Sequence, residues 1–180
     1  MTKFSLRGAG IDVSGIIAQL DSQSWLWDSN VSRKTDCNSP HAEMSDIWVR
    51  YCSTLNPPMD QPHVSEMLPG WHALPSIHDL VFDVARRERA TQLGGILITR
   101  IPPGGCIKPH DDRGSWHSEF YNTKVYAVLR SNARCINECE GEEVNMRTGE
   151  VWTFDNLRSH SVVNGGVTER ITLIVCMRTE

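Results

Sequence analysis

Residues 160–177 read HSVVNGGVTERITLIVCM, and this stretch decides the fold class. Residues 171–177 are apolar on both faces of an extended chain, and Gly165 and Gly166 supply a turn before them. A strand that is buried on both faces needs a packed layer on each side. We therefore expect this strand to lie inside a sheet, with helices from the N-terminal part of the chain covering one face.

Strands recur through the second half of the chain. Short runs rich in β-branched and aromatic residues alternate there with turns that carry Gly, Pro and Asn. Seven strands at this spacing are typical of a sandwich or barrel, so the sequence predicts a mainly β protein with flanking helices. The expected strands are Gly95–Ile101, Lys124–Leu129, Ala133–Asn137, Glu143–Met146, Glu150–Phe154, Ser161–Asn164 and Arg170–Met177.

The first half of the chain has a different pattern. We expect residues 1–94 to form a helical and loop region that packs on a barrel of residues 95–180, within one structural domain. Apolar residues at helical spacing predict two helices, an alternating run predicts a strand, and a proline-rich stretch predicts an irregular loop. These elements are the helices Ile11–Leu20 and Ser76–Thr91, the strand Asp46–Tyr51 and the loop Asn56–Pro75.

The composition excludes several classes of protein. With 180 residues and a formal net charge of -4, the chain lacks the clustered positive charge on which general nucleic-acid binding rests. It has no apolar run of the roughly 20 residues that span a bilayer, and its N-terminus lacks the apolar core of a signal peptide. We therefore expect a cytoplasmic protein without nucleic-acid or membrane partners, whose six cysteines are reduced and structural.

A candidate metal site begins at residues 109–112, PHDD. His110 and Asp112 are two residues apart, so on extended backbone their side chains point the same way. Alone this pair is a weak signal, because a charged surface turn gives the same pattern. His160, 48 residues downstream at the start of an expected strand, adds a second imidazole. Two histidines and one carboxylate form the facial triad of non-haem Fe(II) oxygenases, which leaves metal positions for cosubstrate and O2.

Arg170 is the candidate anchor for a cosubstrate. A hairpin turning about Val167 would place Asn164 opposite Arg170, so that His160 and Arg170 share a face roughly 13 Å apart along the strand. An arginine side chain and a five-carbon diacid such as 2-oxoglutarate can span this gap, with the far carboxylate paired to the guanidinium. The alternative is a surface charge after a turn, but Arg170 opens an otherwise apolar strand.

Together these motifs closely resemble the aspartyl/asparaginyl β-hydroxylase family of Fe(II)- and 2-oxoglutarate-dependent oxygenases. The resemblance covers about Gly95 to Met177, with a weaker echo at residues 45–51, and is carried by PPGGCIKPHDD, KVYAVLR, GEVWTFDN and SHSVVNGGVTERITLIV. It implies a double-stranded β-helix, also called a jelly roll or cupin-like fold. It also implies that His110, Asp112 and His160 bind the catalytic iron.

The same resemblance implies contacts with cosubstrate and substrate. Arg170, ten residues after the second histidine, would hold the distal carboxylate of 2-oxoglutarate, and the Thr99 hydroxyl would assist. The family often has arginine and histidine on the strand after the proximal motif, where this chain has Lys124 and Tyr126. The presence of Asp112 favours the bacterial branch, which includes free-amino-acid hydroxylases. Candidate substrate contacts are Arg50, Arg113, Trp116 and His117.

The sequence thus predicts a dioxygenase that hydroxylates an unactivated C–H bond and releases succinate and CO2. Its substrate would be an amino acid, a small metabolite or an Asp/Asn side chain of a peptide. Two alternatives stay open. A cupin-like metalloenzyme such as an isomerase would not use 2-oxoglutarate and would give Arg170 no role. A binding module with a degenerate site would bind no iron, although the intact triad speaks against it. Arg50 could equally form a structural ion pair.

Overall fold

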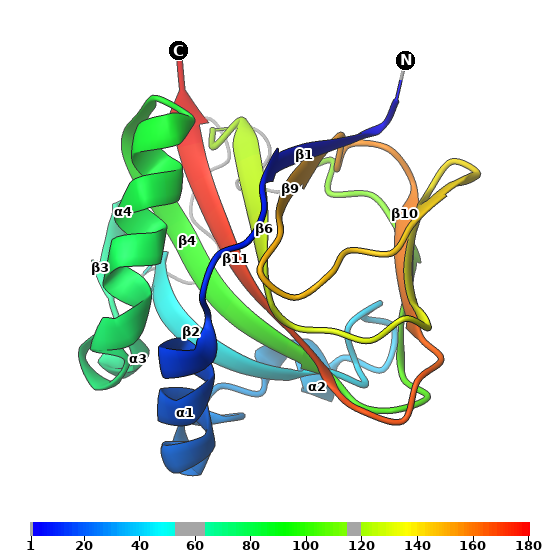
Figure 1. Ribbon diagram of the computed structural model, residues 1–180, viewed down its shortest axis with the longest axis horizontal. Helices are drawn as coiled ribbons and strands as arrows, with labels where there is room; N and C mark the ends of the chain where they lie inside the picture. Colours follow the sequence, from blue (N-terminus) through cyan, green and yellow to red (C-terminus); the bar gives the residue numbers. More distant parts are fainter. Residues whose placement is uncertain (1, 53–63, 115–119) are drawn as a thin grey trace.

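The strands form two antiparallel sheets that face each other in a computed structural model, which describes residues 2–52, 64–114 and 120–180 (Figure 1). The larger sheet has seven strands in the order β1-β9-β6-β11-β4-β2-β3, and the smaller has four in the order β5-β10-β7-β8. Apolar side chains of both sheets meet between them, as where Ile101 packs with Cys135 and Val162. The prediction of a mainly β jelly roll with flanking helices is confirmed.

The elements have the following bounds. The larger sheet contains β1 (Phe4–Gly8), β2 (Ser45–Cys52), β3 (Ser65–Met67), β4 (Ala90–Ile101), β6 (Thr123–Arg130), β9 (Val151–Phe154) and β11 (Arg170–Thr179). The smaller sheet contains β5 (Cys106–His110), β7 (Cys135–Cys139), β8 (Glu142–Val144) and β10 (His160–Asn164). The helices are α1 (Ser14–Ser22), α2 (Ser32–Thr35), α3 (Pro69–Ala73) and α4 (His78–Arg87), with 3-10 turns at Ser24–Leu26 and Pro75–Ile77.

Strand β11 lies between β4 and β6 and is covered on both faces. Ile171, Leu173 and Val175 point into the main core, which they share with buried residues of α1 and α4. The residues between them in sequence, together with Arg170 at the start of the strand, line a cavity between the two sheets. The helices therefore supply the cover that this doubly apolar strand requires, as the sequence predicts.

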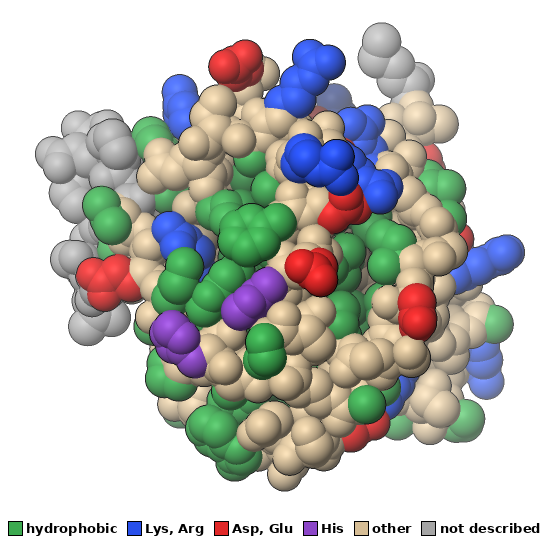
Figure 2. All heavy atoms as spheres, turned by 60° about the vertical axis from the view of Figure 1, so that its left-hand side comes forward, with side chains coloured by type: hydrophobic (Ala, Val, Ile, Leu, Met, Phe, Trp, Pro, Cys, Tyr) green, Lys and Arg blue, Asp and Glu red, His purple; other side chains and the backbone are tan. Residues whose placement is uncertain are grey.

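Helices α1, α3 and α4 lie against the outer face of the larger sheet (Figure 1). In α4, Leu80, Val81 and Val84 are buried at helical spacing and face the strands. Trp71 of α3 belongs to the same core and stacks on His78, the first residue of α4, with ring centroids 3.9 Å apart. Figure 2 turns the left-hand side of Figure 1 forward and shows hydrophobic and histidine side chains next to each other. None of the helices in the described part of the chain has the length and apolar character needed to cross a membrane.

The sequence misplaces several elements of the first half. The first helix begins at Ser14 rather than Ile11. Helix α4 begins at His78 rather than Ser76, because Ser76 lies in the preceding 3-10 turn, where its N–H donates to the Gln19 side chain. The described end of the expected loop Asn56–Pro75 contains β3 and α3, and the rest of that loop lies outside the described residues. The sequence pattern does not predict strands β1 and β5, since Arg7 and Lys108 interrupt the apolar residues of these short segments.

A β-bulge in β2 changes which side chains face the cavity. The register of β2 against β4 shifts between Trp48 and Arg50, so one residue is inserted there. The sequence predicts that Ile47, Val49 and Tyr51 share a face. Ile47 and Val49 do lie in the main core, but Tyr51 lines the cavity with Trp48, and the two rings pack edge to face at 4.3 Å.

The predicted hairpin between His160 and Arg170 is wrong. Strand β10 pairs with β5 and β7 in the smaller sheet, whereas β11 pairs with β4 and β6 in the larger one. Arg170 lies opposite Ile101, and Asn164 lies opposite Cys135. The turn at residues 165–169 therefore carries the chain across from one sheet to the other.

Candidate active site

His110 and His160 face each other across two neighbouring strands. His110 is the last residue of β5 and His160 the first residue of β10, and they are register partners in this antiparallel pair. Their ring centroids are 4.3 Å apart. Asp112 follows two residues after His110, and its Oδ1 lies 3.8 Å from His110 Nε2. One ligand atom from each of the three residues lies within 4.8 Å of the other two, so together they could hold a metal ion.

Both imidazoles are held in the same way. His110 Nδ1 donates a hydrogen bond to the Lys108 carbonyl at 2.8 Å, and His160 Nδ1 donates one to the Arg158 carbonyl at 2.8 Å. A proton on Nδ1 leaves Nε2 as the lone-pair nitrogen that a metal requires. Burial lowers the pKa of His110, which further favours the neutral ligand form.

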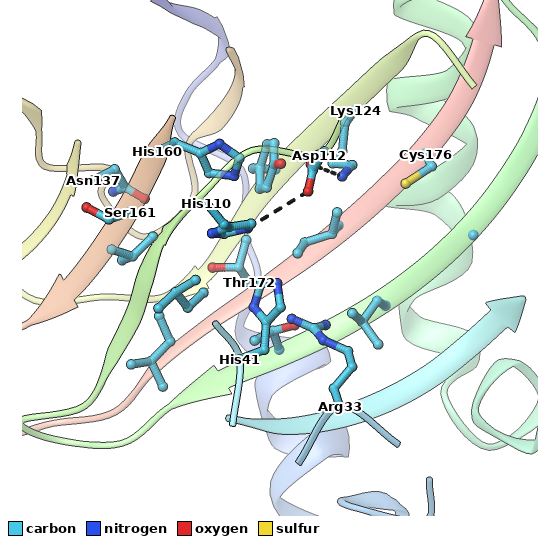
Figure 3. A pocket seen from close by; sticks show the side chains of 18 of the residues that line it. Arg33, His41, His110, Asp112, Lys124, Asn137, His160, Ser161, Thr172 and Cys176 are labelled. Carbon is cyan, nitrogen blue, oxygen red and sulfur yellow. Dashed lines mark hydrogen bonds and ion pairs between the residues drawn. The ribbon is translucent and has the colours of Figure 1, made fainter. Parts of the chain in front are cut away.

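Asp112 is oriented by two donors. Its Oδ2 accepts hydrogen bonds from Lys124 on β6 and from the Asn156 side chain, the latter at 2.8 Å. The Asp112 N–H also donates to the Asn156 carbonyl at 3.0 Å, so the two loops are tied together. Burial alone would raise the pKa of this carboxyl, but Lys124 and Asn156 hold it well below its usual range. The group is therefore an anion ready to coordinate a metal (Figure 3).

The cluster opens into a cavity of about 440 Å³ between the sheets. Arg170 lines this cavity and is only 3% exposed. Its Nε has no hydrogen-bond partner among the described residues, and the guanidinium contacts only weak sulfur groups there, Met146 Sδ at 3.6 Å from Nη2 and the Cys135 thiol. A buried guanidinium without an acidic partner is costly unless an anion pairs with it. The guanidinium of Arg170 thus lies in the cavity without an acidic partner among the described residues.

The other predicted cosubstrate residues also line the cavity. The Thr99 hydroxyl donates to Asp46 Oδ1 at 2.9 Å, so it is already engaged with the protein. The ring of Tyr126 stacks on Phe154 at 4.7 Å, and burial raises its pKa well above the ordinary value. Lys124 is paired with Asp112, as described above. All three residues line the same cavity as the cluster and Arg170.

The described candidate substrate residues do not line the cavity. Arg50 is not among the residues that line the cavity, since the bulge in β2 turns it aside. Arg113 is 71% exposed and pairs with Asp111 at 2.7 Å, so it lies on the surface. Trp116 and His117 lie outside the described residues.

Sequence reasoning missed the wall formed by the segment around α2. Arg33 and His41 line the cavity beside the triad, and the His41 ring packs edge to face on His110 at 4.7 Å. Burial and the nearby Arg33 lower the pKa of His41 to about 2, so its imidazole is neutral. His41 is not part of the metal-ligand cluster. No local pattern marks these residues, because only the fold brings them to the site.

Comparison with known proteins agrees with this geometry. A 2OG-Fe(II) oxygenase-family oxidoreductase from Burkholderia pseudomallei has a TM-score of 0.63 and 16% identity, over 97% of this chain and 83% of that one. A cupin domain from Bordetella pertussis matches with a TM-score of 0.38 and 18% identity, over 49% of this chain and 85% of that one. The family model for aspartyl/asparaginyl beta-hydroxylases matches residues 68–179, which is more than half of the chain and contains all three residues of the cluster. The chain belongs to the aspartyl/asparaginyl β-hydroxylase family.

Proposed function

We propose that this protein is an Fe(II)- and 2-oxoglutarate-dependent oxygenase that hydroxylates an unactivated C–H bond. The donor set of His110, Asp112 and His160 suits Fe(II), because both imidazoles present Nε2 and the carboxylate is ionised. The observation that carries the proposal is Arg170, a buried guanidinium in the same cavity whose Nε has no hydrogen-bond partner in the described part of the chain. A dicarboxylate that reaches from the triad to Arg170 would supply the missing anion.

The overall reaction consumes substrate, O2 and 2-oxoglutarate and yields the alcohol, succinate and CO2. Bound Fe(II), with 2-oxoglutarate and O2, would supply the oxidising chemistry that no side chain can provide. The chain's own part is positioning. His110, Asp112 and His160 would occupy one face of the metal, and Arg170 would fix the far carboxylate of 2-oxoglutarate. Tyr126 and Thr172, which line the space between them, would hold its carbon chain in place.

Apolar side chains in the cavity would limit water around the reacting groups. Its walls carry apolar side chains from three strands of the larger sheet, among them Trp48, Leu97 and Ile174. A dry site strengthens the ion pair at Arg170 and limits wasteful oxidation when no substrate is present. The substrate would be an amino acid, a small metabolite or an Asp/Asn side chain of a peptide, with no nucleic acid or membrane involved.

Succinate release from 2-oxoglutarate tests the proposal. The wild-type protein with Fe(II) should form succinate. Arg170→Met should raise the KM for 2-oxoglutarate by roughly 10- to 100-fold, which is the change in affinity expected from losing a hydrogen-bonded charge pair. Arg86→Met is the matched control, because Arg86 is 79% exposed on α4 and should leave the KM unchanged. A metalloenzyme that does not use 2-oxoglutarate would form no succinate and would tolerate Arg170→Met.

A further inference from the structure

The cavity has two walls of different origin. The triad and Arg170 all lie within residues 68–179, the part of the chain that matches the family model. Another part of the cavity wall comes from residues outside this range, namely Arg33 and His41 from the segment around α2 and Trp48 and Tyr51 from β2. In Figure 3, Arg33 and His41 point from below towards His110 and Asp112. This second wall is where a molecule other than the cosubstrate would lie.

Arg33 places a guanidinium in this wall that has one long ion-pair contact. Its Nη1 lies 3.4 Å from Asp46 Oδ2, which is longer than a charge-assisted hydrogen bond of about 2.8 Å. Among the described residues Asp46 is its only ion-pair partner, and the other oxygen of Asp46 is engaged by Thr99. A guanidinium carries five N–H donors in a planar fork. With one edge turned to Asp46, the remaining donors are available to an anion in the cavity.

His41 adds a polar atom without a partner beside Arg33. Its Nδ1 is buried and has no hydrogen-bond partner among the described residues. The backbone fixes its position, because the Lys108 N–H on β5 donates to the Pro40 carbonyl at 3.1 Å. The Cys106 N–H on the same strand donates to the Glu43 side chain at 3.1 Å. The segment that carries His41 is thus fastened along the strand that carries His110.

Apolar side chains border this second wall. Trp48 is 9% exposed, and Leu97 and Ile174 lie beside it on the neighbouring strands, opposite each other in the register of β4 and β11. Their side chains line the same cavity as Arg33. Such a surface suits a short hydrocarbon chain rather than a polar one. The exposed Asp36 also lines the cavity, but as a carboxylate it would repel an acid rather than bind it.

We propose that Arg33, aided by His41, binds the carboxylate of the primary substrate, a small acid whose apolar chain lies against Trp48, Leu97 and Ile174. This inference rests on the proposed function for the reaction that follows, but the binding itself does not require it. Anchored at Arg33, the acid would present its chain to the face of the triad that points into the cavity. Arg33 would then select substrates, whereas Arg170 would hold the cosubstrate.

The test uses 4-methylpentanoate and its uncharged amide as probes. Binding is measured by calorimetry under argon, with protein that holds Fe(II) and 2-oxoglutarate, so that Arg170 is occupied. The wild-type protein should bind the acid more tightly than the amide. Arg33→Met should weaken acid binding by roughly 10- to 100-fold and leave amide binding unchanged. Arg33→Lys should lose less, and the surface control Arg86→Met should lose nothing.

A double variant separates direct binding from charge repulsion. Arg33→Met leaves Asp46 buried without its ion-pair partner, and that unpaired carboxylate could repel an acid. Arg33→Met/Asp46→Asn removes both charges and should bind the acid as weakly as Arg33→Met alone. Recovery of acid binding in the double variant would overturn the proposal. Equal binding of acid and amide by the wild-type protein would overturn it too.

A second arm distinguishes this inference from the proposed function. In metal-free Arg170→Met the cosubstrate anchor is gone, so acid binding that depends on Arg33 must come from the site proposed here. If the wild-type protein binds no 2-oxoglutarate but still binds the acid through Arg33, the proposed function fails and the inference stands. If 2-oxoglutarate binds and Arg33→Met leaves acid binding intact, the inference fails and the proposed function stands.

Discussion

His110 and His160 are register partners on adjacent strands, and each donates its Nδ1 proton to the carbonyl two residues earlier in the chain. The pairing of β5 with β10 thus sets the distance between the imidazoles, and the two carbonyls set the nitrogen that each presents. Residues 108 and 158 contribute only backbone atoms to this arrangement. A pair of ligands is therefore fixed by the sheet itself, and Asp112 joins it from the loop that follows β5.

Removal of one imidazole should abolish metal binding. His160→Ala leaves two of the three ligands of the cluster, which is too few to hold a divalent ion against water. Titration with Co(II), followed by its visible absorption, should show one site per chain in the wild-type protein and none in the variant. His72→Ala is the control, since His72 is an exposed residue of α3 and should not affect the titration. Unchanged Co(II) binding by His160→Ala would contradict the assignment of the cluster.

Asn156 should matter although it is not itself a ligand. Its side chain donates to Asp112 Oδ2, and its carbonyl accepts the Asp112 N–H. Loss of such an orienting contact costs roughly 10- to 100-fold in metal affinity. We expect this loss for Asn156→Ala in the same Co(II) titration, with the exposed Asn38→Ala as control. An affinity equal to wild type would mean that Asp112 is held by Lys124 alone.

The two faces of β11 should respond differently to truncation. Leu173 is fully buried between the sheet and the helices, so Leu173→Ala should lower the free energy of unfolding by about 2–5 kcal/mol. Ile174 is half-buried and borders an existing cavity, so Ile174→Ala should cost clearly less. Urea unfolding of both variants checks this order. Equal losses would contradict the assignment of one face to the core and the other to the cavity.

Cys176 should make stability fall at alkaline pH. Burial raises the pKa of its thiol from the ordinary value near 9 to about 11, so the folded state binds its proton more tightly than the unfolded state does. This contribution is fully present below pH 9 and is lost as the pH rises towards 11. Urea unfolding of the metal-free protein over this range should show a steeper decline for wild type than for Cys176→Ala. Parallel curves would show that the thiol is not desolvated.

Much of the fold follows from patterns that the sequence carries locally. The double-sided apolar run of β11 predicts a central strand with helices behind it, and the core that Leu173 shares with α1 and α4 confirms this. The spacing of His110 and Asp112, together with His160, predicts residues that the structure does bring together. Each of these signals is a property of one segment, or of a motif that the family shares.

The parts that could not be predicted depend on contacts between distant segments. The turn after Asn164 could make a hairpin or cross to the other sheet. The outcome depends on which strands pair with β10 and β11, and local residues do not determine this. The bulge in β2, which places Tyr51 in the cavity and turns Arg50 away, is likewise set by pairing with β4. Arg33 lies on a helix of four residues without a recognisable motif, so only the fold reveals it at the site.

The measurement that tests the central claim most directly is an anaerobic titration of the protein with Fe(II) in the presence of 2-oxoglutarate. A keto acid that chelates iron gives a weak visible charge-transfer band, which neither component gives alone. We predict that the band appears and saturates at one Fe(II) per chain, is absent from His160→Ala, and needs a much higher concentration of 2-oxoglutarate in Arg170→Met. Full metal binding without the band, or a band that is indifferent to Arg170, would contradict the account.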